Sequence, residues 1–167
     1  IYDGRAYIGD DIHSTSGSGQ TYEQSVASGA TATYHVYVYN DGNLAQPLAV
    51  TGTAGNSKWM VRYVDYVTGT DITTAATSTG WATPSLSPGA GRRLKVLVTP
   101  QSGALGGEVR SLLVTGTSTV DTTKCDAVKA CTTCAPTSQP DGLIYNGTAY
   151  IGDGAYNTSG TGQTYAQ

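Results

Sequence analysis

The chain has 167 residues, of which 13% are charged, and its formal net charge is −3. A chain with so few charges and a slight negative excess has no basic face for nucleic acid and no polybasic patch for anionic lipid, so we expect neither partner. No uninterrupted apolar stretch is long enough to cross a bilayer, so we expect no membrane insertion of this segment. The 14 Ser, 26 Thr, 22 Gly and 12 Tyr residues favour strands and turns and predict an all-β chain.

The first 24 residues recur near the end of the chain. Residues 1–24 read IYDGRAYIGDDIHSTSGSGQTYEQ, and residues 144–167, at an offset of 143, read IYNGTAYIGDGAYNTSGTGQTYAQ. We call these segments the first arm copy and the second arm copy. Sixteen of the 24 aligned positions are identical, including the blocks YIGD and GQTY. A period of 143 residues predicts a tandem array of whole domains, and we expect the chain to be a window of a longer polymer or a processed chain.

Between the two arm copies, short strand-like runs alternate with turn signals. The clearest run is residues 30–40, in which small, valine and tyrosine side chains at even positions alternate with a more polar set at odd positions. In residues 92–99 the alternation is equally clear, with Leu94, Val96 and Val98 expected inward and Arg93 and Lys95 outward. Turns rich in Asn, Asp, Gly and Pro separate the runs. The further predicted strands are residues 47–53, 59–65, 109–117 and 126–130.

Two stretches of the chain carry a family resemblance. The succession ATYHVYVYNDGN (residues 32–43), then SLSPGAGRRLKVLVTP (residues 85–100), then a final strand pair resembles the bacterial and archaeal tandem Ig-like cell-surface repeats of the CARDB type. This resemblance implies an immunoglobulin-like antiparallel β-sandwich. The YIGD and GQTY blocks of the arm are also similar to repeats of glycan-coated extracellular fibrils.

The repeat period is longer than one such domain. An Ig-like domain needs about 100 residues, so the excess of the 143-residue period falls at the arm and at the cysteine-bearing segment. We therefore expect residues 1–131 to form a sandwich with an exchangeable N-terminal arm. Residues 132–143 are expected to be a linker containing Cys and Pro, and residues 144–167 to be the first strands of the next repeat.

Patterns typical of catalysis or metal binding are scarce. The chain has two histidines, and the arm repeat places a tyrosine opposite His13, which argues against a required ligand or base there. The run Gly-Ser-Gly at 17–19 lacks the third glycine and the following helix of a dinucleotide loop. The two aspartates at 10 and 11 could bind Ca²⁺, but the second is a glycine in the second arm copy, so solvated turn carboxylates are the favoured interpretation. We expect no enzyme activity, no metal and no cofactor.

Three cysteines, Cys125, Cys131 and Cys134, lie near the end of the predicted sandwich. A low-charge, Thr-rich, repeated chain suggests an oxidising exterior, where cysteines usually pair. The C-x-x-C spacing would also suit zinc or redox chemistry, but no second pair, nearby histidine or thioredoxin-like pattern accompanies it. We predict a disulfide between Cys131 and Cys134, with Cys125 free or bonded to another chain. A bond between Cys125 and Cys134 is the alternative.

Two N-glycosylation sequons lie in the second arm copy, at Asn146 and Asn157. The first arm copy has Asp3 and Ser14 at the matching positions. We expect covalent glycans at Asn146 or Asn157, and the many threonines offer further sites for O-linked glycans.

The second arm copy lacks the strands that follow the first one. About two dozen residues cannot bury enough apolar surface to offset the entropy of their ordering. We therefore predict that residues 150–153 and 164–167 add as strands to an adjacent copy by strand donation or domain swapping, with residues 7–10 and 21–24 in the matching role. The residues assigned to this assembly arm are Tyr150, Ile151, Gly152, Asp153 and Tyr165.

These expectations favour one function and leave one alternative. The favoured function is a structural subunit of a secreted filament or surface stalk that assembles with identical copies of itself, because a polymer reuses one interface. The alternative is an adhesin or carbohydrate-binding accessory module of a surface protein, which needs only one or two copies. Both place the protein outside the cell or at the cell surface.

Overall fold

The computed structural model describes residues 1–138, 140–155 and 159–166. They belong to two compact units, Ile1–Pro136 and Thr137–Gln167, and each unit is described by itself. We call the first unit the two-sheet domain. Among the described residues, no helix has the length and apolar character needed to span a membrane.

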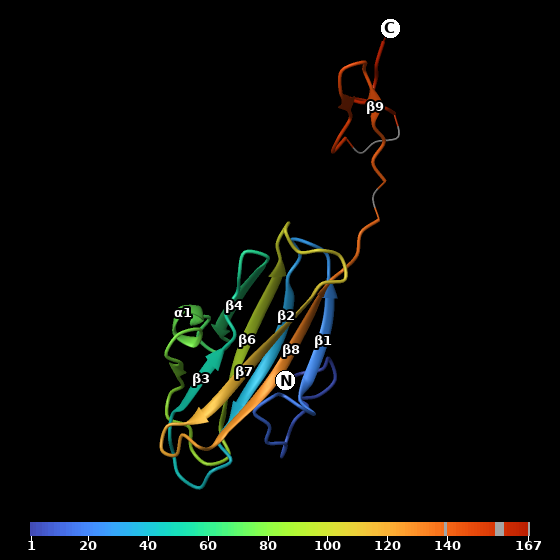
Figure 1. The fold of residues 1–167 in the computed structure, drawn as a ribbon. Coiled ribbons are helices and arrows are strands. Elements are labelled where there is room, and N and C mark those ends of the chain that lie inside the picture. Colours follow the sequence, from blue (N-terminus) through green and yellow to red (C-terminus); the bar gives the residue numbers. More distant parts are fainter. Residues whose placement is uncertain (139, 156–158, 167) are drawn as a thin grey trace. The chain divides into compact units, whose positions relative to one another are not determined.

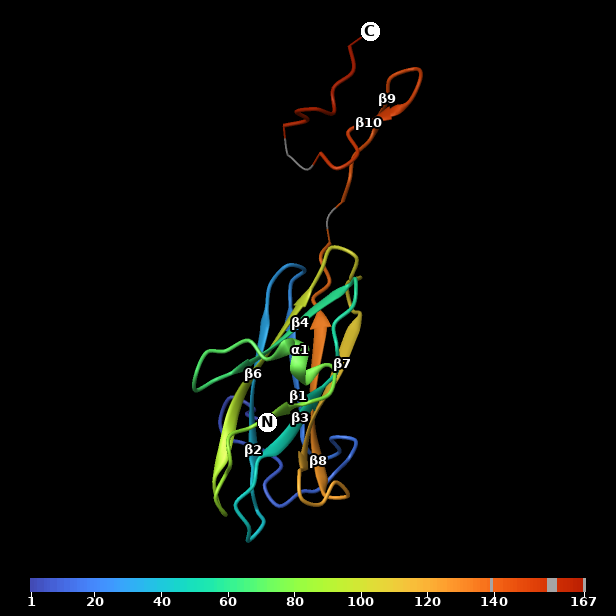
Figure 2. The ribbon, with the colours of Figure 1, turned by 90° about the vertical axis from the view of Figure 1, so that its left-hand side faces the viewer.

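The two-sheet domain, whose residues are all described, is built from two facing β-sheets and one short helix (Figures 1 and 2). One sheet has the strand order β1-β8-β7-β3-β5, and the other has the order β2-β6-β4. Paired strands are antiparallel except for β1, which runs parallel to β8. The elements are β1 (Thr21–Val26), β2 (Ala32–Tyr39), β3 (Leu48–Gly52), β4 (Trp59–Asp65), α1 (Thr73–Ala76), β5 (Trp81–Ala82), β6 (Gly91–Pro100), β7 (Val109–Ser118) and β8 (Cys125–Cys134).

Side chains from both sheets form one core between them. Every second residue of β2 and β6 points inward, because successive side chains of a strand lie on opposite faces. Burying each Val or Leu stabilises the fold by roughly 1.5–3 kcal/mol. Core residues with an exposure of 1% or less include Tyr34, Val36, Val50, Trp59, Tyr63, Leu94, Val96, Val98, Leu112, Val114 and Ala130.

Polar groups within this core have partners. The buried Tyr34 hydroxyl donates a hydrogen bond to the carbonyl oxygen of Cys131 at 2.6 Å and lies 2.8 Å from the Thr132 hydroxyl, so it connects β2 to the facing strand β8. The carboxylate of Asp65, at the end of β4, accepts hydrogen bonds from Arg92 at the start of β6, one of them 2.8 Å long from Nε. The Tyr34 contacts hold the two sheets together, and the Asp65–Arg92 contacts hold β4 and β6 in register within one sheet.

The all-β prediction is confirmed, since strands and turns account for nearly the whole domain. The alternation predicted for residues 30–40 and 92–99 matches the burial of β2 and β6, and β3, β4 and β7 lie where strands were expected. Three features differ from the prediction. Helix α1 and strand β5 were not expected, and β8 continues through Cys134, so residues 132–134 belong to the sheet and not to a linker.

The second unit contains two short strands, β9 (Ile144–Tyr145) and β10 (Tyr150–Ile151), which pair in an antiparallel fashion. These four residues lie in the second arm copy. The unit is too small for a core of its own, and its exposed side chains include Leu143, Ile144, Tyr145, Tyr150 and Tyr165.

Candidate functional site: the arm and its docking face

The first arm copy begins with a tight hairpin held by its own sequence. Tyr2 and Tyr7 form an isolated antiparallel bridge, and their rings are in contact with centroids 5.3 Å apart. Between them, the Asp3 carboxylate accepts hydrogen bonds from the backbone N–H groups of Arg5 and Ala6, both 2.8 Å long. These backbone donors lower the pKa of Asp3. Gly4 has a φ of +97°, which only glycine adopts easily, so the sequence Asp-Gly fits this turn.

The second arm copy has the same internal geometry. Tyr145 and Tyr150 occupy the positions of Tyr2 and Tyr7, and their ring centroids are again 5.3 Å apart. Asn146 replaces Asp3, and its Oδ1 accepts the same two backbone hydrogen bonds, at 3.0 and 2.9 Å. The turn glycine, now Gly147, again has a positive φ, of +91°. Because the two copies lie in separate units, this conformation follows from the arm sequence and not from its surroundings.

In the two-sheet domain the first arm copy is docked through backbone hydrogen bonds to both sheets. The N–H of Tyr2 donates to the carbonyl oxygen of His35 in β2 at 2.9 Å. On the other sheet, the N–H groups of Ala127 and Lys129 in β8 donate to the carbonyl oxygens of Ser14 and Gln20, at 2.7 and 2.9 Å. In Figures 1 and 2 the first arm copy, coloured dark blue, lies along the lower half of the strands. The last four residues of the arm, 21–24, are the first four residues of β1.

A buried glutamine anchors the docked arm. The side chain of Gln20 is 2% exposed, and its Nε2 donates to the carbonyl oxygen of Ile12 at 2.8 Å and to Oδ1 of Asp126 at 2.7 Å. The same carboxylate oxygen accepts the backbone N–H of Ser14 at 2.7 Å. A buried amide needs such partners, since leaving one unsatisfied costs about 1–3 kcal/mol. We call His35, Asp126, Ala127 and Lys129 the docking face.

Gly9 makes room for that glutamine. It has a φ of +96°, and a Cβ placed on it would lie 2.2 Å from Oε1 of Gln20, which is too close for any side chain. The matching residue in the second arm copy, Gly152, has a φ of +102°, and a Cβ there would lie 2.6 Å from Cγ of Gln163. Glycine and glutamine are therefore packed together in both copies.

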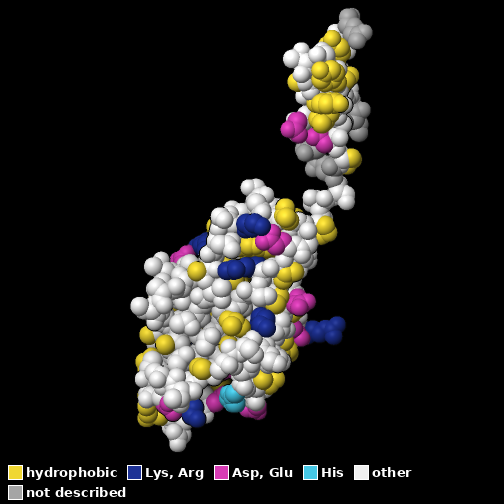
Figure 3. Space-filling model, in the orientation of Figure 1, with side chains coloured by type: hydrophobic (Ala, Val, Ile, Leu, Met, Phe, Trp, Pro, Cys, Tyr) yellow, Lys and Arg dark blue, Asp and Glu magenta, His cyan; other side chains and the backbone are white. Residues whose placement is uncertain are grey.

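The two copies differ in burial. Ile1 is 2% exposed in the domain, whereas the matching Ile144 is 37% exposed, and Tyr150 is 68% exposed against 37% for Tyr7. Figure 3 shows hydrophobic side chains gathered on the visible face of the second unit. Gln163 donates its Nε2 to the carbonyl oxygen of Gly142, a contact within its own unit. Ile144 and Tyr150 are thus more exposed in the second arm copy than Ile1 and Tyr7 are in the first.

The residues predicted to form the assembly arm have the following positions. Tyr150 and Ile151 form β10, Gly152 and Asp153 enter the turn after it, and Tyr165 lies outside any strand. The pairing partner of β10 within the chain is β9, and pairing with an adjacent copy stays a prediction. In the first arm copy, residues 21–24 lie in β1 and pair with β8 of the same chain, while residues 7–10 contain only an isolated bridge at Tyr7. The matching role of these residues toward an adjacent copy stays a prediction. Asn157 lies outside the described residues.

The cysteines are free in the structure, and the expected bond between Cys131 and Cys134 is not present. Both residues belong to β8, where a separation of three positions puts their side chains on opposite faces and their Cα atoms about 10 Å apart. A disulfide needs Cα atoms within about 7 Å, so the bond would require part of β8 to unravel. The alternative bond, between Cys125 and Cys134, would join the first and last residues of β8 and meets the same objection. A bond from Cys125 to another chain stays a prediction.

Gln20 and Asp126 were not predicted as site residues from the sequence. Gln20 had a signal, because it lies in the repeated GQTY block, but Asp126 had none. His13 and His35 occupy separate positions, in the arm and in β2, and among the described residues no three His, Cys, Asp or Glu side chains gather as a metal would require. The pKa of His35 is lowered by its partial burial and by the nearby cations Lys95 and Arg93.

Comparisons with known proteins leave the family open. No family model matches the chain, and no curated protein matches it. Among solved structures, the chain is similar to the secreted serine protease VesC from Vibrio cholerae, with 13% identity, a TM-score of 0.44 and coverage of 69% of this chain and 22% of that one. It is also similar to a family 123 glycoside hydrolase from Clostridium perfringens studied for glycolipid glycan hydrolysis, with 7% identity, a TM-score of 0.44 and coverage of 73% and 24%. The chain therefore spans about a quarter or less of either protein's length.

Proposed function

We propose that this chain is a repeating structural subunit of a secreted extracellular filament or surface stalk, which assembles by docking the arm of one repeat on the two-sheet domain of another. One observation carries this proposal. The second arm copy has the internal geometry of the docked first arm copy, but its Ile144 is 37% exposed where the docked Ile1 is 2% exposed. Its natural partner is a surface like the docking face, and a further copy of the two-sheet domain supplies one.

The fold supports an immunoglobulin-like assignment within this proposal. The sheet containing β3, β7 and β8 and the sheet containing β2, β4 and β6 have the strand orders of the C-F-G and B-E-D sheets of the immunoglobulin arrangement. Strand β1 then takes the place of a first strand paired with the last one. Domains of this type commonly serve as spacers and filament units, which suits the proposal.

The proposed assembly mode is strand donation or domain swapping. When an arm docks on another copy, it forms the same contacts that the first arm copy forms within its own chain, so exchange costs little free energy and is favoured by a high protein concentration. The segment between β8 and the second arm copy carries Pro136 and Pro140 and few apolar residues, which suits a connection between repeats.

Asn146 is the described candidate for a covalent glycan. Its side-chain oxygen is used by the turn, at 3.0 and 2.9 Å from two backbone nitrogens, and its side-chain nitrogen donates no hydrogen bond within the described residues. The nitrogen is the atom that carries an N-linked glycan, so the arm conformation and a glycan are compatible at this position. An intact mass of the native material equal to that of the bare sequence would remove glycosylation from the proposal.

A refolding experiment tests the assembly. The full chain is unfolded in urea and refolded at a series of protein concentrations, and the products are examined by size exclusion with light scattering and by electron microscopy. We expect linear oligomers whose fraction rises with concentration. The Gly152→Ala chain should form far fewer, because a Cβ would lie 2.6 Å from Cγ of Gln163 and 3.0 Å from the carbonyl oxygen of Gly142.

The control variant is Gly154→Asp. A Cβ added at Gly154 would have no atom within 4 Å, and the matching residue of the first arm copy is Asp11, which adopts a φ of +56°. This variant should oligomerise like the parent chain. Monomers at every concentration, or equal oligomerisation of the Gly152 variant and the parent, would contradict the proposed assembly.

A further inference from the structure

A continuous row of tyrosine rings lies at the outer face of β2, where the first arm copy meets it. Tyr2 and Tyr7 are in contact within the arm, Tyr7 lies 5.6 Å from Tyr37, and Tyr37 lies 5.7 Å from Tyr39, measured between ring centroids. We call these four residues the tyrosine row. Tyr7, Tyr37 and Tyr39 keep 37, 36 and 43% of their surface exposed. Exposed rings in unbroken contact form a surface that packing of the core does not explain, since the core lies on the other face of β2.

Two cations border this row without a carboxylate partner. Arg93 lies opposite Tyr37 in the pairing of β2 with β6, and its guanidinium is 5.8 Å from the centroid of that ring. Lys95, two residues further along β6, has its ammonium 4.8 Å from the centroid of Tyr66. Neither forms an ion pair within the fully described two-sheet domain, where Lys58, Arg62 and Arg92 are the cations that contact an Asp or Glu. Two positive charges therefore remain available to a negatively charged ligand at this face.

The hydroxyl groups of the tyrosine row are also available to a ligand. Within the fully described two-sheet domain, no hydroxyl of the tyrosine row forms a hydrogen bond with another protein group, in contrast to the buried hydroxyls of Tyr34 and Tyr63. A surface depression lies beside the row, where the arm, β2 and β6 meet. It is lined by Tyr2, Tyr7, His35, Tyr66 and Arg93.

We propose that the tyrosine row, together with Arg93 and Lys95, binds an acidic polysaccharide. The apolar faces of pyranose rings pack on aromatic rings, the tyrosine hydroxyls exchange hydrogen bonds with sugar hydroxyls, and the planar guanidinium of Arg93 accommodates a carboxylate or sulfate group. Charge complementarity favours an acidic polymer over a neutral one. A single-stranded nucleic acid also stacks on aromatic rings, but it needs a basic groove along its backbone, and this chain has a net charge of −3 with two unpaired cations at the row.

This binding does not depend on assembly between copies, because the domain's own first arm copy supplies Tyr2 and Tyr7. The second arm copy carries the same ring pair at Tyr145 and Tyr150, with an equal centroid distance. In the proposed filament each docked arm would complete one tyrosine row per repeat, so the polymer would present the site many times, which raises its avidity for a long polysaccharide.

The test is affinity electrophoresis and titration calorimetry of the full chain, at a concentration where it is monomeric, with polygalacturonate as the probe. Hydroxyethyl cellulose serves as the neutral polymer and oligo-dT as the nucleic acid. We expect binding to polygalacturonate that weakens with added salt, and much weaker binding to both other probes. In the double variant Arg93→Gln, Lys95→Gln the affinity should fall about tenfold, since each lost contact with an exposed cation is a modest one.

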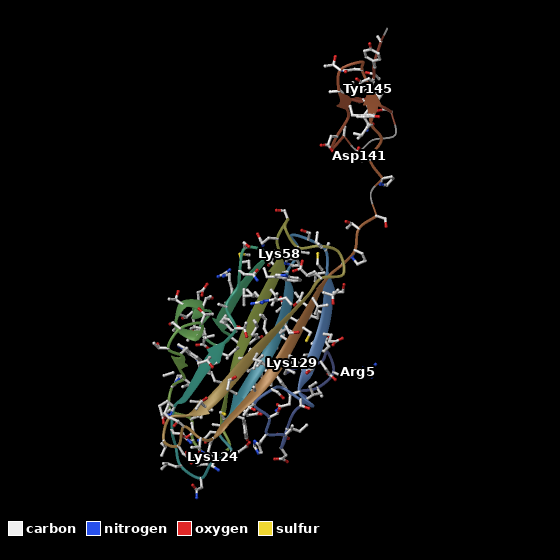
Figure 4. All side chains as sticks on the ribbon, in the orientation of Figure 1. Arg5, Lys58, Lys124, Lys129, Asp141 and Tyr145 are labelled. Carbon is white, nitrogen blue, oxygen red and sulfur yellow. The ribbon has the colours of Figure 1, made fainter. Side chains whose placement is uncertain are left out.

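Two further variants make the test specific. Tyr7→Ser removes a ring from the tyrosine row without changing the core, and it should also weaken binding. The double variant Lys58→Gln, Lys124→Gln removes the same amount of charge from the two opposite ends of the domain, as Figure 4 shows. This control should leave the affinity unchanged. Retained far-ultraviolet circular dichroism checks that each variant is folded. Absence of binding to polygalacturonate, equal weakening in both double variants, or tighter binding of oligo-dT would overturn the inference.

Discussion

Replacing Gly9 by alanine tests whether the docked arm depends on the packing of glycine against the buried glutamine. The added Cβ would lie 2.2 Å from Oε1 and 2.7 Å from Cδ of Gln20, so this side chain must leave its position. It would then lose its hydrogen bonds to Asp126 and to the carbonyl oxygen of Ile12. A lost bond to a charged group costs about 1.5–3 kcal/mol. The positive φ adds about 1–2 kcal/mol, because an L-residue is strained there.

Gly29→Ala is the matched control. Gly29 lies in the turn between β1 and β2, has a φ of +81°, and has no atom within 4 Å of the position of an added Cβ. This variant carries the backbone strain alone, so the difference between the two variants isolates the glutamine contact. We expect Gly9→Ala to lose about 2 kcal/mol more than Gly29→Ala, the cost of one bond to a charged group.

Hydrogen exchange is the suitable assay, because the arm can open without unfolding the domain. The N–H groups of Ala127 and Lys129 donate to arm carbonyls, so their exchange rates report arm opening. In Gly9→Ala both amides should exchange at least about 30-fold faster than in Gly29→Ala, because the glutamine contact alone accounts for about 2 kcal/mol. Amides between β2 and β6 should keep their rates. Equal exchange of Ala127 and Lys129 in the two variants would refute the idea that the glutamine anchors the arm.

Three further predictions concern the domain itself. Burial raises the pKa of Tyr34 to about 12, so the contribution of Tyr34 to stability should be complete below about pH 10 and fall by about 1.4 kcal/mol per pH unit up to about pH 12. Burial also raises the pKa of Tyr63, which adds its own loss, so Tyr34→Phe should show a shallower loss in urea titrations at about pH 9–12. Burial raises the pKa of Asp65, but hydrogen bonds from Arg92, Thr68 and a backbone N–H outweigh burial, so the net effect is a lowered pKa. Asp65→Asn should therefore cost about 3 kcal/mol of stability at neutral pH and make the loss of stability below about pH 4 less steep. An acid profile equal to that of the parent chain would contradict this. Cys125 is the least buried cysteine, so iodoacetamide should label it first in the native protein. Cys125→Ser should abolish any covalent dimer on non-reducing gels. Faster labelling of Cys131 or Cys134 would count against the fold of β8.

The sequence predicted those strands whose alternation is clear. β2 and β6 were found because a hydrophobic residue stands at every second position and a turn ends each run. α1 was missed because Thr73–Ala76 has no capping side chain and no amphipathic length, and it is held by tertiary packing of Ile72 and Ala76 in the core. β5 is two residues long, which is too short to show an alternation of hydrophobic and polar side chains.

The end of β8 was misinterpreted for a different reason. The cysteine spacing suggested a disulfide within a linker, whereas Thr132 is fully buried and its hydroxyl contacts that of Tyr34. The candidate site was predicted in part: the repeated blocks identified the arm, but its receptor Asp126 is 112 residues from Ser14 and 106 from Gln20. Such long-range contacts leave no local pattern in a single sequence.

The two arm copies, compared position by position, indicate what docking requires. Residues that are buried or closely packed in the first copy are retained in the second: Ile1 as Ile144, Gly9 as Gly152 and Gln20 as Gln163. Substitutions fall where side chains are exposed or interchangeable. Arg5, which points into solvent in Figure 4, is replaced by threonine, and Asp3 is replaced by an asparagine that accepts the same two hydrogen bonds.

This pattern matters because Ile144 is 37% exposed and so gains little from burial within its own unit, although the matching Ile1 is a core residue. Ordering a free segment costs about 1–2 kcal/mol per residue, but an arm already folded by its own turns loses much less on docking. A preformed arm with intact docking residues is therefore ready to bind a second docking face rapidly and with little loss of entropy. The same reasoning predicts that Asp3→Asn, which copies the second arm into the first, leaves the exchange rates of Ala127 and Lys129 unchanged within about twofold, because asparagine supplies the acceptor that the turn needs. A large increase in either rate would show that the two arms are not interchangeable, and the exchange of arms between copies would lose its structural basis.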